Sequence, residues 1–119
     1  MSDIELEELA SRLDDEGLTI LDVRTEAEFS GVAGYPCDPR QGHIPGARNL
    51  DVAYLVECSP EEVRALVALP EDSEIVAYCH TGARSATAVA ALRAAGYRAR
   101  NYPGSWHEWS RREELGPEG

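Results

Sequence analysis

A cysteine followed within a few residues by a glycine, an arginine and a serine has the clearest potential for chemistry in this sequence. The segment reads Cys79, His80, Thr81, Gly82, Ala83, Arg84, Ser85. Gly82 can adopt the positive φ that turns successive backbone N–H groups toward one centre. Such donors, with Arg84 close by, favour the thiolate over the thiol. We therefore predict that Cys79 is a nucleophile held in an anion-binding loop formed by residues 80–85.

A purely structural role for Cys79 is the alternative, because unpaired cysteines are often buried as small apolar residues. That interpretation gives no reason for Gly82, Arg84 and the small residues that surround the turn. The nucleophile is therefore the favoured interpretation.

The elements on either side of Cys79 are those that would position such a loop. Residues 75–78 form a short apolar, β-branched and aromatic run bounded by polar residues, which predicts a buried strand. Residues 86–95 are rich in alanine and contain no proline, which favours a helix. The order strand, cysteine, tight turn, helix places the thiol at the carboxyl end of a strand and near a helix N-terminus.

Further strands and helices alternate along the rest of the chain. Apolar runs predict strands at 18–23, near 49–50 and at 97–102, and a loop is expected at 31–41. Capping boxes predict four more helix starts: Ser2 with Glu5, Thr25 with Glu28, Ser59 with Glu62, and Ser105 with Glu108. The alternation indicates an α/β fold with a parallel sheet. We expect residues 1–119 to form a single domain with a polar, loosely held tail from about residue 111.

Charge and composition restrict the partners. The 119 residues contain 22 Asp and Glu against 11 Lys and Arg, a net charge of -11. A field of that sign disfavours nucleic acid and anionic membranes, so any anion site must be locally positive. A secretory signal and a long apolar span are lacking, which predicts a cytoplasmic protein.

Three cysteines at unrelated spacings predict neither a disulfide framework nor a metal site, and no cofactor is expected. Cys37 lies in the loop before the 42–47 turn, where it could accept sulfur or form a disulfide with Cys79. An inert loop thiol is the favoured interpretation of Cys37. We assign no role to Cys58.

Four short motifs together resemble one family. They are DVR with EF at 22–24 and 28–29, GHIPGA at 42–47, CHTGARS at 79–85, and GSW with EW at 104–106 and 108–109. In this order they resemble the rhodanese (thiosulfate sulfurtransferase) family, in a single-domain form similar to the catalytic half of its two-domain members. The resemblance implies an open parallel sheet of about five strands with helices on both faces.

The resemblance also implies an activity. Cys79 maps onto the family nucleophile, which takes the outer sulfur of thiosulfate as a persulfide and passes it to a thiophilic acceptor, cyanide in an assay and a thiol or protein in the cell. The implied partners are thus a small sulfur-donor anion and its acceptor, and residues 80–85 would contact the donor. Related cell-cycle phosphatases and arsenate reductases have five residues between cysteine and arginine, whereas Cys79 and Arg84 are separated by four. The shorter loop favours sulfur transfer.

Two positions depart from the family pattern. His80 stands where active members often have arginine, and an exposed histidine is mostly uncharged at neutral pH. Glu28 stands where the two-domain animal enzymes have a substrate-contacting arginine, which favours thiosulfate over mercaptopyruvate. Arg84 could contact the donor or could instead pair with a carboxylate.

Four more residues are expected to support the site. Asp22 and Arg24 are interpreted as an ion pair that braces neighbouring loops, and His43 as a packing residue rather than a base. Trp106 is expected in the core, where it could also form a wall of the site. A different class of function stays open, in which the chain is a sulfur carrier or a regulatory module that docks a partner through its acidic surface.

Overall fold

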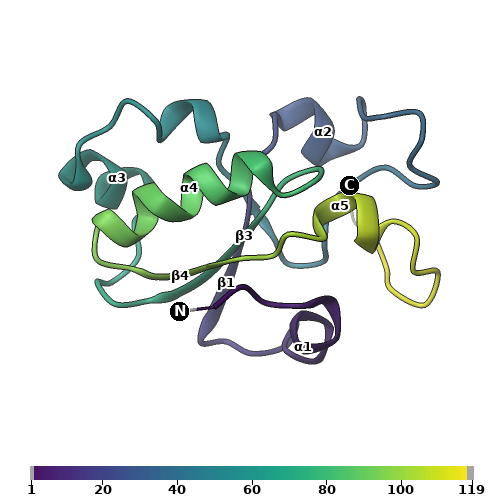
Figure 1. Ribbon diagram of the computed structural model, residues 1–119, viewed down its shortest axis with the longest axis horizontal. Helices are drawn as coiled ribbons and strands as arrows, with labels where there is room; N and C mark the ends of the chain where they lie inside the picture. Colours follow the sequence, from purple (N-terminus) through teal and green to yellow (C-terminus); the bar gives the residue numbers. More distant parts are fainter. Residues whose placement is uncertain (1, 118–119) are drawn as a thin grey trace.

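The computed structural model describes residues 2–117. Its strands are β1 (Leu18–Asp22), β2 (Arg48–Asn49), β3 (Glu74–Tyr78) and β4 (Arg98–Asn101). Its helices are α1 (Leu6–Ser11), α2 (Glu26–Ser30), the 3₁₀ helix η1 (Val52–Tyr54), α3 (Pro60–Val67), α4 (Ala83–Ala94) and α5 (Ser105–Trp109). The last two of these helices flank the segment that follows β3 (Figure 1).

The strands form one parallel sheet in the order β2-β1-β3-β4. The predicted α/β architecture is therefore confirmed, with four strands in the described residues rather than about five. At the outer edge of β4, the N–H of Ile4 donates to the carbonyl of Asn101 over 2.9 Å, but this single bond does not extend into a further strand. β3 is central, with a neighbour on each side.

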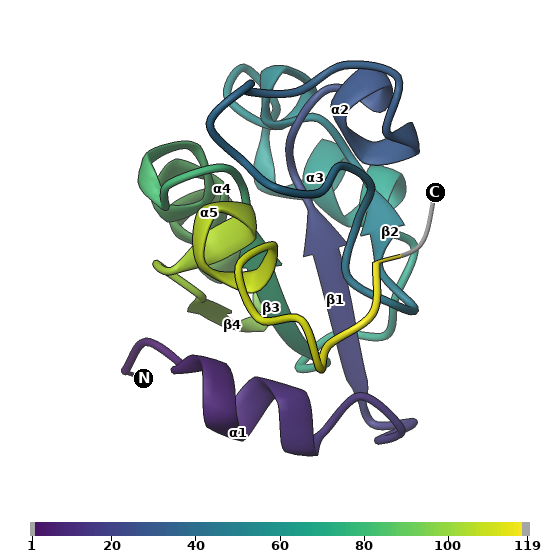
Figure 2. The same cartoon turned by 90° about the vertical axis from the view of Figure 1, so that its right-hand side faces the viewer.

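Helices cover both faces of the sheet, α3 and α4 on one and α1 on the other (Figures 1 and 2). Side chains of a strand alternate between faces, and β3 follows this rule. Ile75 and Ala77 pack in the core beside α3 and α4, whereas Val76 and Tyr78 pack in the core that includes α1 and α5. The alternation sends Cys79, the next residue, toward α4.

Two of the predicted capping boxes are confirmed. The hydroxyl of Thr25 accepts from the N–H of Glu28, and that of Ser59 accepts from the N–H of Glu62. In both, the glutamate side chain accepts from the backbone N–H of the capping residue. These local sequence signals fixed the starts of α2 and α3.

The other two capping boxes are wrong. α1 begins at Leu6, with Glu5 as its N-cap, so Ser2 lies too far upstream to cap it. α5 begins at Ser105 itself, after Gly104, and the described residues give it no side-chain cap. The hydroxyl of Ser105 is instead engaged with the residues around Cys79, as described below.

The start of the predicted tail makes contacts with the rest of the domain up to Leu115. The guanidinium of Arg40, in the 31–41 loop, donates to the carbonyl oxygens of Trp109, Ser110, Arg112 and Leu115. This side chain fastens the C-terminal segment to a loop about seventy residues earlier in the chain. Residues 118–119 of the predicted tail lie outside the described residues.

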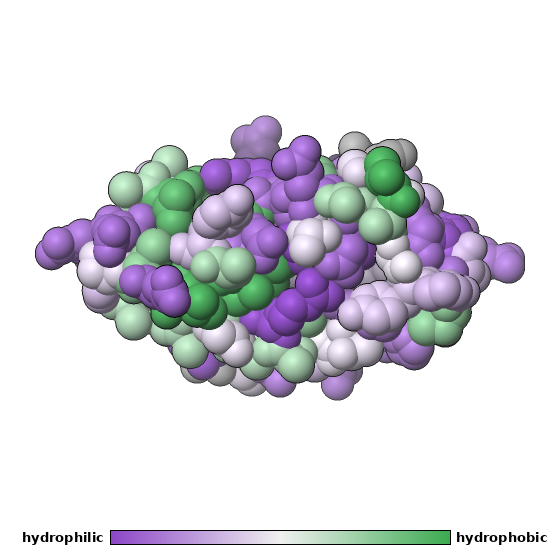
Figure 3. Space-filling view, turned by 90° about the horizontal axis from the view of Figure 1, so that it is seen from above, coloured by the Kyte–Doolittle hydropathy of each residue, from purple (hydrophilic) through white to green (hydrophobic). Residues whose placement is uncertain are grey.

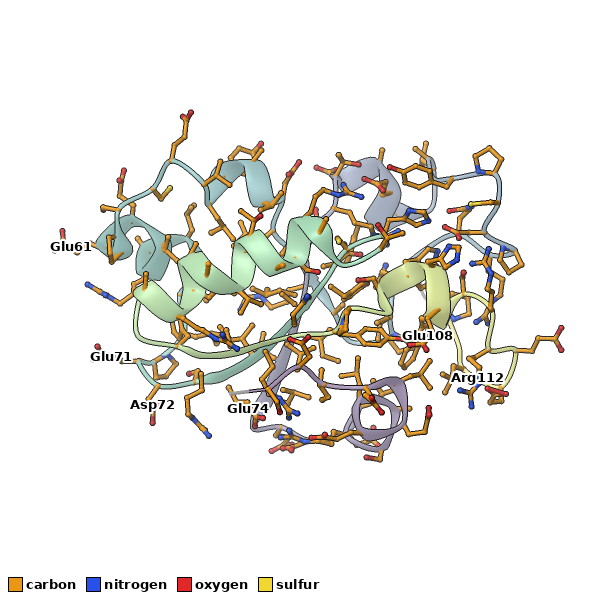
Figure 4. The ribbon with its side chains drawn as sticks, viewed as in Figure 1. Glu61, Glu71, Asp72, Glu74, Glu108 and Arg112 are labelled. Atoms are coloured by element: carbon orange, nitrogen blue, oxygen red, sulfur yellow. The ribbon has the colours of Figure 1, made fainter. Side chains whose placement is uncertain are left out.

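The surface carries separate apolar and polar areas. On the face with α2, α3 and α4, hydrophobic patches are interrupted by hydrophilic residues (Figure 3). Glu61, Glu71 and Asp72 are exposed at the end of the molecule opposite α5 (Figure 4), as expected for solvated acidic residues. Within residues 2–117, none of the helices has the length and apolar character needed to cross a bilayer.

Candidate active site

The sulfur of Cys79 lies at the centre of a ring of hydrogen-bond donors. Its Sγ accepts from the N–H of Gly82 at 3.1 Å, and from the N–H and the hydroxyl of Ser85 at 3.4 Å each. The loop between β3 and α4 thus turns its amides inward, as the position of Gly82 predicts. Cys79 is 1% exposed, so these donors act in a site largely shielded from water.

The donors change the ionisation of Cys79. Burial by itself raises the pKa of the thiol, because it disfavours the charged form. The hydrogen bonds from the Ser85 hydroxyl and from the loop amides, including that of Thr81, outweigh burial, and the pKa of Cys79 is lowered overall. The ring therefore favours the thiolate, the nucleophilic form of cysteine.

Gly82 is required by two features of its surroundings. Its φ is +98°, in the left-handed region where side chains are strained. A Cβ at this position would also lie 2.8 Å from the carbonyl oxygen of Pro103, closer than real contacts allow. The turn thus lets the loop approach the 103–104 segment while its N–H points to Cys79.

The N-terminus of α5 anchors the loop from the other side. The hydroxyl of Ser105 accepts from the N–H of Cys79 over 3.0 Å and donates to the carbonyl of Tyr102 over 2.9 Å. The N–H groups of Trp106 and His107 donate to the carbonyls of Cys79 and His80. Ser105 has φ +54°, so the backbone there is held in a conformation unusual for a residue with a side chain.

Arg84 binds a carboxylate, the alternative named above for it. Its Nη1 and Nη2 atoms donate to Glu28 Oε1 and Oε2 at 2.9 and 3.1 Å. Burial raises the pKa of Glu28, but the guanidinium and the Thr25 cap lower it to about 2. Because Glu28 balances the charge of Arg84, the main stabilisation of charge on Cys79 comes from the Ser85 hydroxyl and the loop amides.

His80 is buried, and the expectation of an exposed histidine is wrong. Its Nε2 lies 2.9 Å from Asp38 Oδ2, and its ring stacks on Tyr35 with centroids 3.8 Å apart. The ring thus faces the 31–41 loop. Thr81 and Ala83, by contrast, are exposed at the rim. A contact of His80 with a sulfur donor stays a prediction.

Asp22 and Arg24 form a buried ion pair behind the loop. Arg24 Nη2 donates to Asp22 Oδ2 at 2.7 Å and to the carbonyl of Gly42 at 2.6 Å. The hydroxyl of Tyr78 also donates to Asp22, and the Arg24 guanidinium lies over the ring of Trp106. The pair thus links the ends of β1 and β3, the 42–47 turn and α5, which agrees with the bracing role expected for it.

His43 and Trp106 lie in packing positions. His43 stacks on Phe29 with centroids 3.7 Å apart, and its Nδ1 is 2.8 Å from the Phe29 carbonyl. Trp106 is fully buried, and its indole N–H donates to the carbonyl of Arg40. Both side chains thus help to hold the 40–47 segment in place.

Sequence reasoning missed three residues around this loop: Ser105 as a support of Cys79, and Tyr35 and Asp38 as neighbours of His80. A signal for Ser105 was present, because it directly follows the Pro103–Gly104 turn and belongs to the GSW motif. Asp38 and Tyr35 lie in a loop without periodicity, and neither carries a local pattern that points to His80.

Fold and loop together define a class: α/β proteins that present a cysteine in an amide-lined, anion-holding loop after the central strand. Comparison with known proteins gives the family. The model of the rhodanese-like domain matches residues 5–112, and the chain belongs to that family.

Individual relatives agree with this assignment. The chain is 41% identical over 110 residues to the "Putative thiosulfate sulfurtransferase" of Haloferax volcanii, with 80% of this chain and 38% of the relative covered. It is 38% identical over 106 residues to "Sulfur carrier protein TtuD" of Thermus thermophilus, with 76% and 37% covered. The chain thus spans less than two fifths of the length of these curated relatives.

A solved structure is also similar. The crystal structure of a "Probable Thiosulfate Sulfurtransferase" superposes with a TM-score of 0.84 at 42% identity, with 98% of this chain and 47% of that chain covered. The similarity therefore extends over nearly all of this chain and about half of the other.

Proposed function

We propose that this chain is a thiosulfate sulfurtransferase that works through a persulfide on Cys79, with residues 1–119 acting as one domain. The observation that carries the proposal is the convergence of donors from Gly82 and Ser85 on Cys79 Sγ. These donors stabilise negative charge on sulfur both before and after transfer, in the manner of an oxyanion hole. The names of the relatives support the same chemistry.

The reaction takes place in two displacements. The Cys79 thiolate attacks the outer sulfur of thiosulfate, a new S–S bond forms, and sulfite leaves with the electron pair of the old bond. Cyanide, or a thiolate of the cell, then attacks the outer sulfur of the persulfide and releases Cys79 as thiolate. This is covalent catalysis in which the enzyme alternates between two forms, and it requires no general base once the thiol is ionised.

The loop suits sulfur better than phosphate. Four residues separate Cys79 from Arg84, and Arg84 is paired with Glu28 rather than aimed at the sulfur. A phosphatase or arsenate reductase would need cationic groups on the transferred oxyanion. Cys79-dependent hydrolysis of an aryl phosphate would contradict our assignment.

Thiocyanate formation from thiosulfate and cyanide tests the proposal. The wild-type protein is expected to turn over, Cys79→Ser to be inactive, and Cys58→Ser to behave as wild type, since Cys58 lies in the segment before α3. Absence of thiocyanate with the wild-type protein, or a Cys79→Ser rate equal to that of the wild type, would refute the proposed enzymatic activity.

A sulfur carrier is the second candidate, favoured by the similarity to the Thermus carrier and by the acidic surface. In that case Cys79 would gain about 32 Da, one sulfur atom, from a partner's persulfide but not from thiosulfate. Intact mass after incubation with each donor separates the two: ready loading by thiosulfate supports the enzyme.

A further inference from the structure

Four residues with metal-binding side chains, none of them Cys79, gather around the side chain of His80. They are Cys37 and Asp38 from the 31–41 loop, His80 from the loop after β3, and His107 from α5. One ligand atom from each lies within 4.8 Å of the ligand atoms of the other three. The cluster therefore joins three segments that are far apart in the sequence.

The polar atoms of this cluster are close together but poorly paired. His80 Nε2 is 2.9 Å from Asp38 Oδ2, and His107 Nδ1 is 3.4 Å from Asp38 Oδ1. Yet all three of Asp38 Oδ2, His80 Nε2 and His107 Nδ1 are buried without a hydrogen-bond partner in the described part of the chain. Buried polar atoms are rarely left without a partner, and an ion bound between these atoms would give each of them one.

We propose that Cys37, Asp38, His80 and His107 bind a divalent zinc-class metal ion. One thiolate, two imidazole nitrogens and one carboxylate oxygen form a set that suits Zn²⁺, whereas Mg²⁺ and Ca²⁺ prefer oxygen ligands throughout. The thiolate and the carboxylate also balance the two positive charges of the ion. At metal–ligand distances of about 2.0–2.3 Å, tetrahedral ligand atoms lie about 3.3–3.8 Å apart. His80 Nε2 and Asp38 Oδ2, now 2.9 Å apart, would separate slightly, and the more distant ligand atoms, up to 4.8 Å apart, would approach.

Neighbouring groups hold the ligands in place. The N–H of His107 donates to the carbonyl of His80 over 3.0 Å, which fixes these two backbones relative to each other. Arg111 donates to Asp38 Oδ1 over 3.0 Å and to the carbonyl of Cys37 over 2.8 Å. Its guanidinium covers one carboxylate oxygen and leaves Oδ2 toward His80. Such outer contacts orient ligands in metal sites.

An ion pair between Asp38 and protonated histidines is the competing explanation. It would place N–H donors on the carboxylate with good alignment, whereas the buried nitrogens and Oδ2 lack that alignment. The two explanations differ in experiment, since an ion-paired cluster would bind no metal. The metal site does not depend on sulfur transfer, because its ligands do not include Cys79.

Metal titration of chelator-treated protein tests the proposal. We would use the Cys79→Ser background, in which the reactive thiol of the loop cannot bind the ion, and titrate Zn²⁺ against a chromogenic chelator. One tightly bound ion per chain is expected. Cys37→Ser and His107→Ala should each weaken binding at least about tenfold, because each removes one ligand, whereas Cys58→Ser should not.

Cobalt gives a second readout. Co²⁺ in the site should show a thiolate-to-metal charge-transfer band that is lost in Cys37→Ser and kept in Cys58→Ser. Cys37 is exposed and His107 is partly exposed, so both variants should keep the melting temperature of the metal-free parent. Absence of stoichiometric binding would overturn the site. So would an affinity of Cys37→Ser and His107→Ala equal to that of the Cys79→Ser parent, which would assign the metal to surface carboxylates.

Discussion

Cys79 lies in the loop after β3, Cys37 lies near His80 of the same loop, and the two thiols have opposite surroundings. Cys79 is buried, and backbone N–H groups and a hydroxyl point at its sulfur. Cys37 is exposed, and a carboxylate and two imidazoles lie around it. Donors favour negative charge on sulfur, whereas lone-pair groups favour a cation beside it. The neighbours of each thiol, rather than the thiol, thus decide its chemistry.

The two environments also differ in how they are built. The donors of Cys79 come from residues 81–85, so one turn makes the ring. The neighbours of Cys37 come from three separate segments brought together by the fold. A substitution in the loop around Cys79 should therefore have a strong local effect. A substitution in the cluster around Cys37 should remove one metal ligand and leave the others in place.

Replacing Cys79 has the largest expected effect. Cys79→Ser should lower thiocyanate formation by at least about 10³-fold, since it removes the covalent nucleophile. Steady-state rates with thiosulfate and cyanide measure this. Retention of activity would mean that Cys37 or Cys58 carries the sulfur, and the contrast between the thiols would fail.

Gly82→Ala tests whether backbone geometry makes the ring. Positive φ and the approach of Pro103 together should reduce the free energy of unfolding by about 2–4 kcal/mol. Gly46→Ala is the matched control: its φ is +83° and a Cβ would meet nothing within 4 Å, so strain alone should cost about 1 kcal/mol. Urea denaturation compares the two variants. Equal losses in the free energy of unfolding would show that the contact with Pro103 adds nothing to the cost of Gly82→Ala.

Glu28→Gln tests the ion pair in which Glu28 neutralises Arg84. The pKa of Glu28 is lowered from 4.5 to about 2, so the pair stabilises the fold above pH 4.5 and loses this contribution as pH falls toward 2. The variant should be less stable by about 1–3 kcal/mol near pH 6, and the difference should shrink with acid.

The substitution isolates the charge, because glutamine can replace glutamate in a capping box. Glu26→Gln, at an exposed position of the same helix, is the control. Denaturation at several pH values is the measurement, and a pH-independent difference for Glu28→Gln would argue against the ion pair as its cause.

Ser85→Ala should have the smallest effect. Loss of its hydroxyl removes a donor that lowers the pKa of Cys79, so the pKa should rise and the rate of alkylation by iodoacetamide should fall about tenfold at neutral pH. The difference should vanish at high pH, where Cys79 is a thiolate in both proteins. Thr87→Ala, which removes an exposed hydroxyl on the same helix, should leave the profile unchanged.

The sequence predicted what is local. Spacing and turn chemistry around Cys79 gave the strand, the inward loop and the helix, and Thr25 and Ser59 gave two helix starts. The sequence did not predict contacts between residues far apart in the chain. Ser105 was predicted as a helix cap, but its hydroxyl accepts from the N–H of Cys79. Asp38 lies beside His80 only because tertiary packing brings the two segments together. The family resemblance implied about five strands, whereas the described residues form four, because the segment beside β4 makes a single sheet-like bond, from Ile4 to Asn101.

The near-complete burial of Cys79 has a consequence for selectivity. In the proposed persulfide the second sulfur lies about 2 Å beyond Sγ. An incoming thiolate that attacked Sγ would expel the outer sulfur as hydrosulfide and form a mixed disulfide with Cys79, which would halt turnover. Because the protein shields Sγ of Cys79, an acceptor reaches the terminal sulfur instead. The transferred sulfur then leaves with the acceptor, and Cys79 is regenerated.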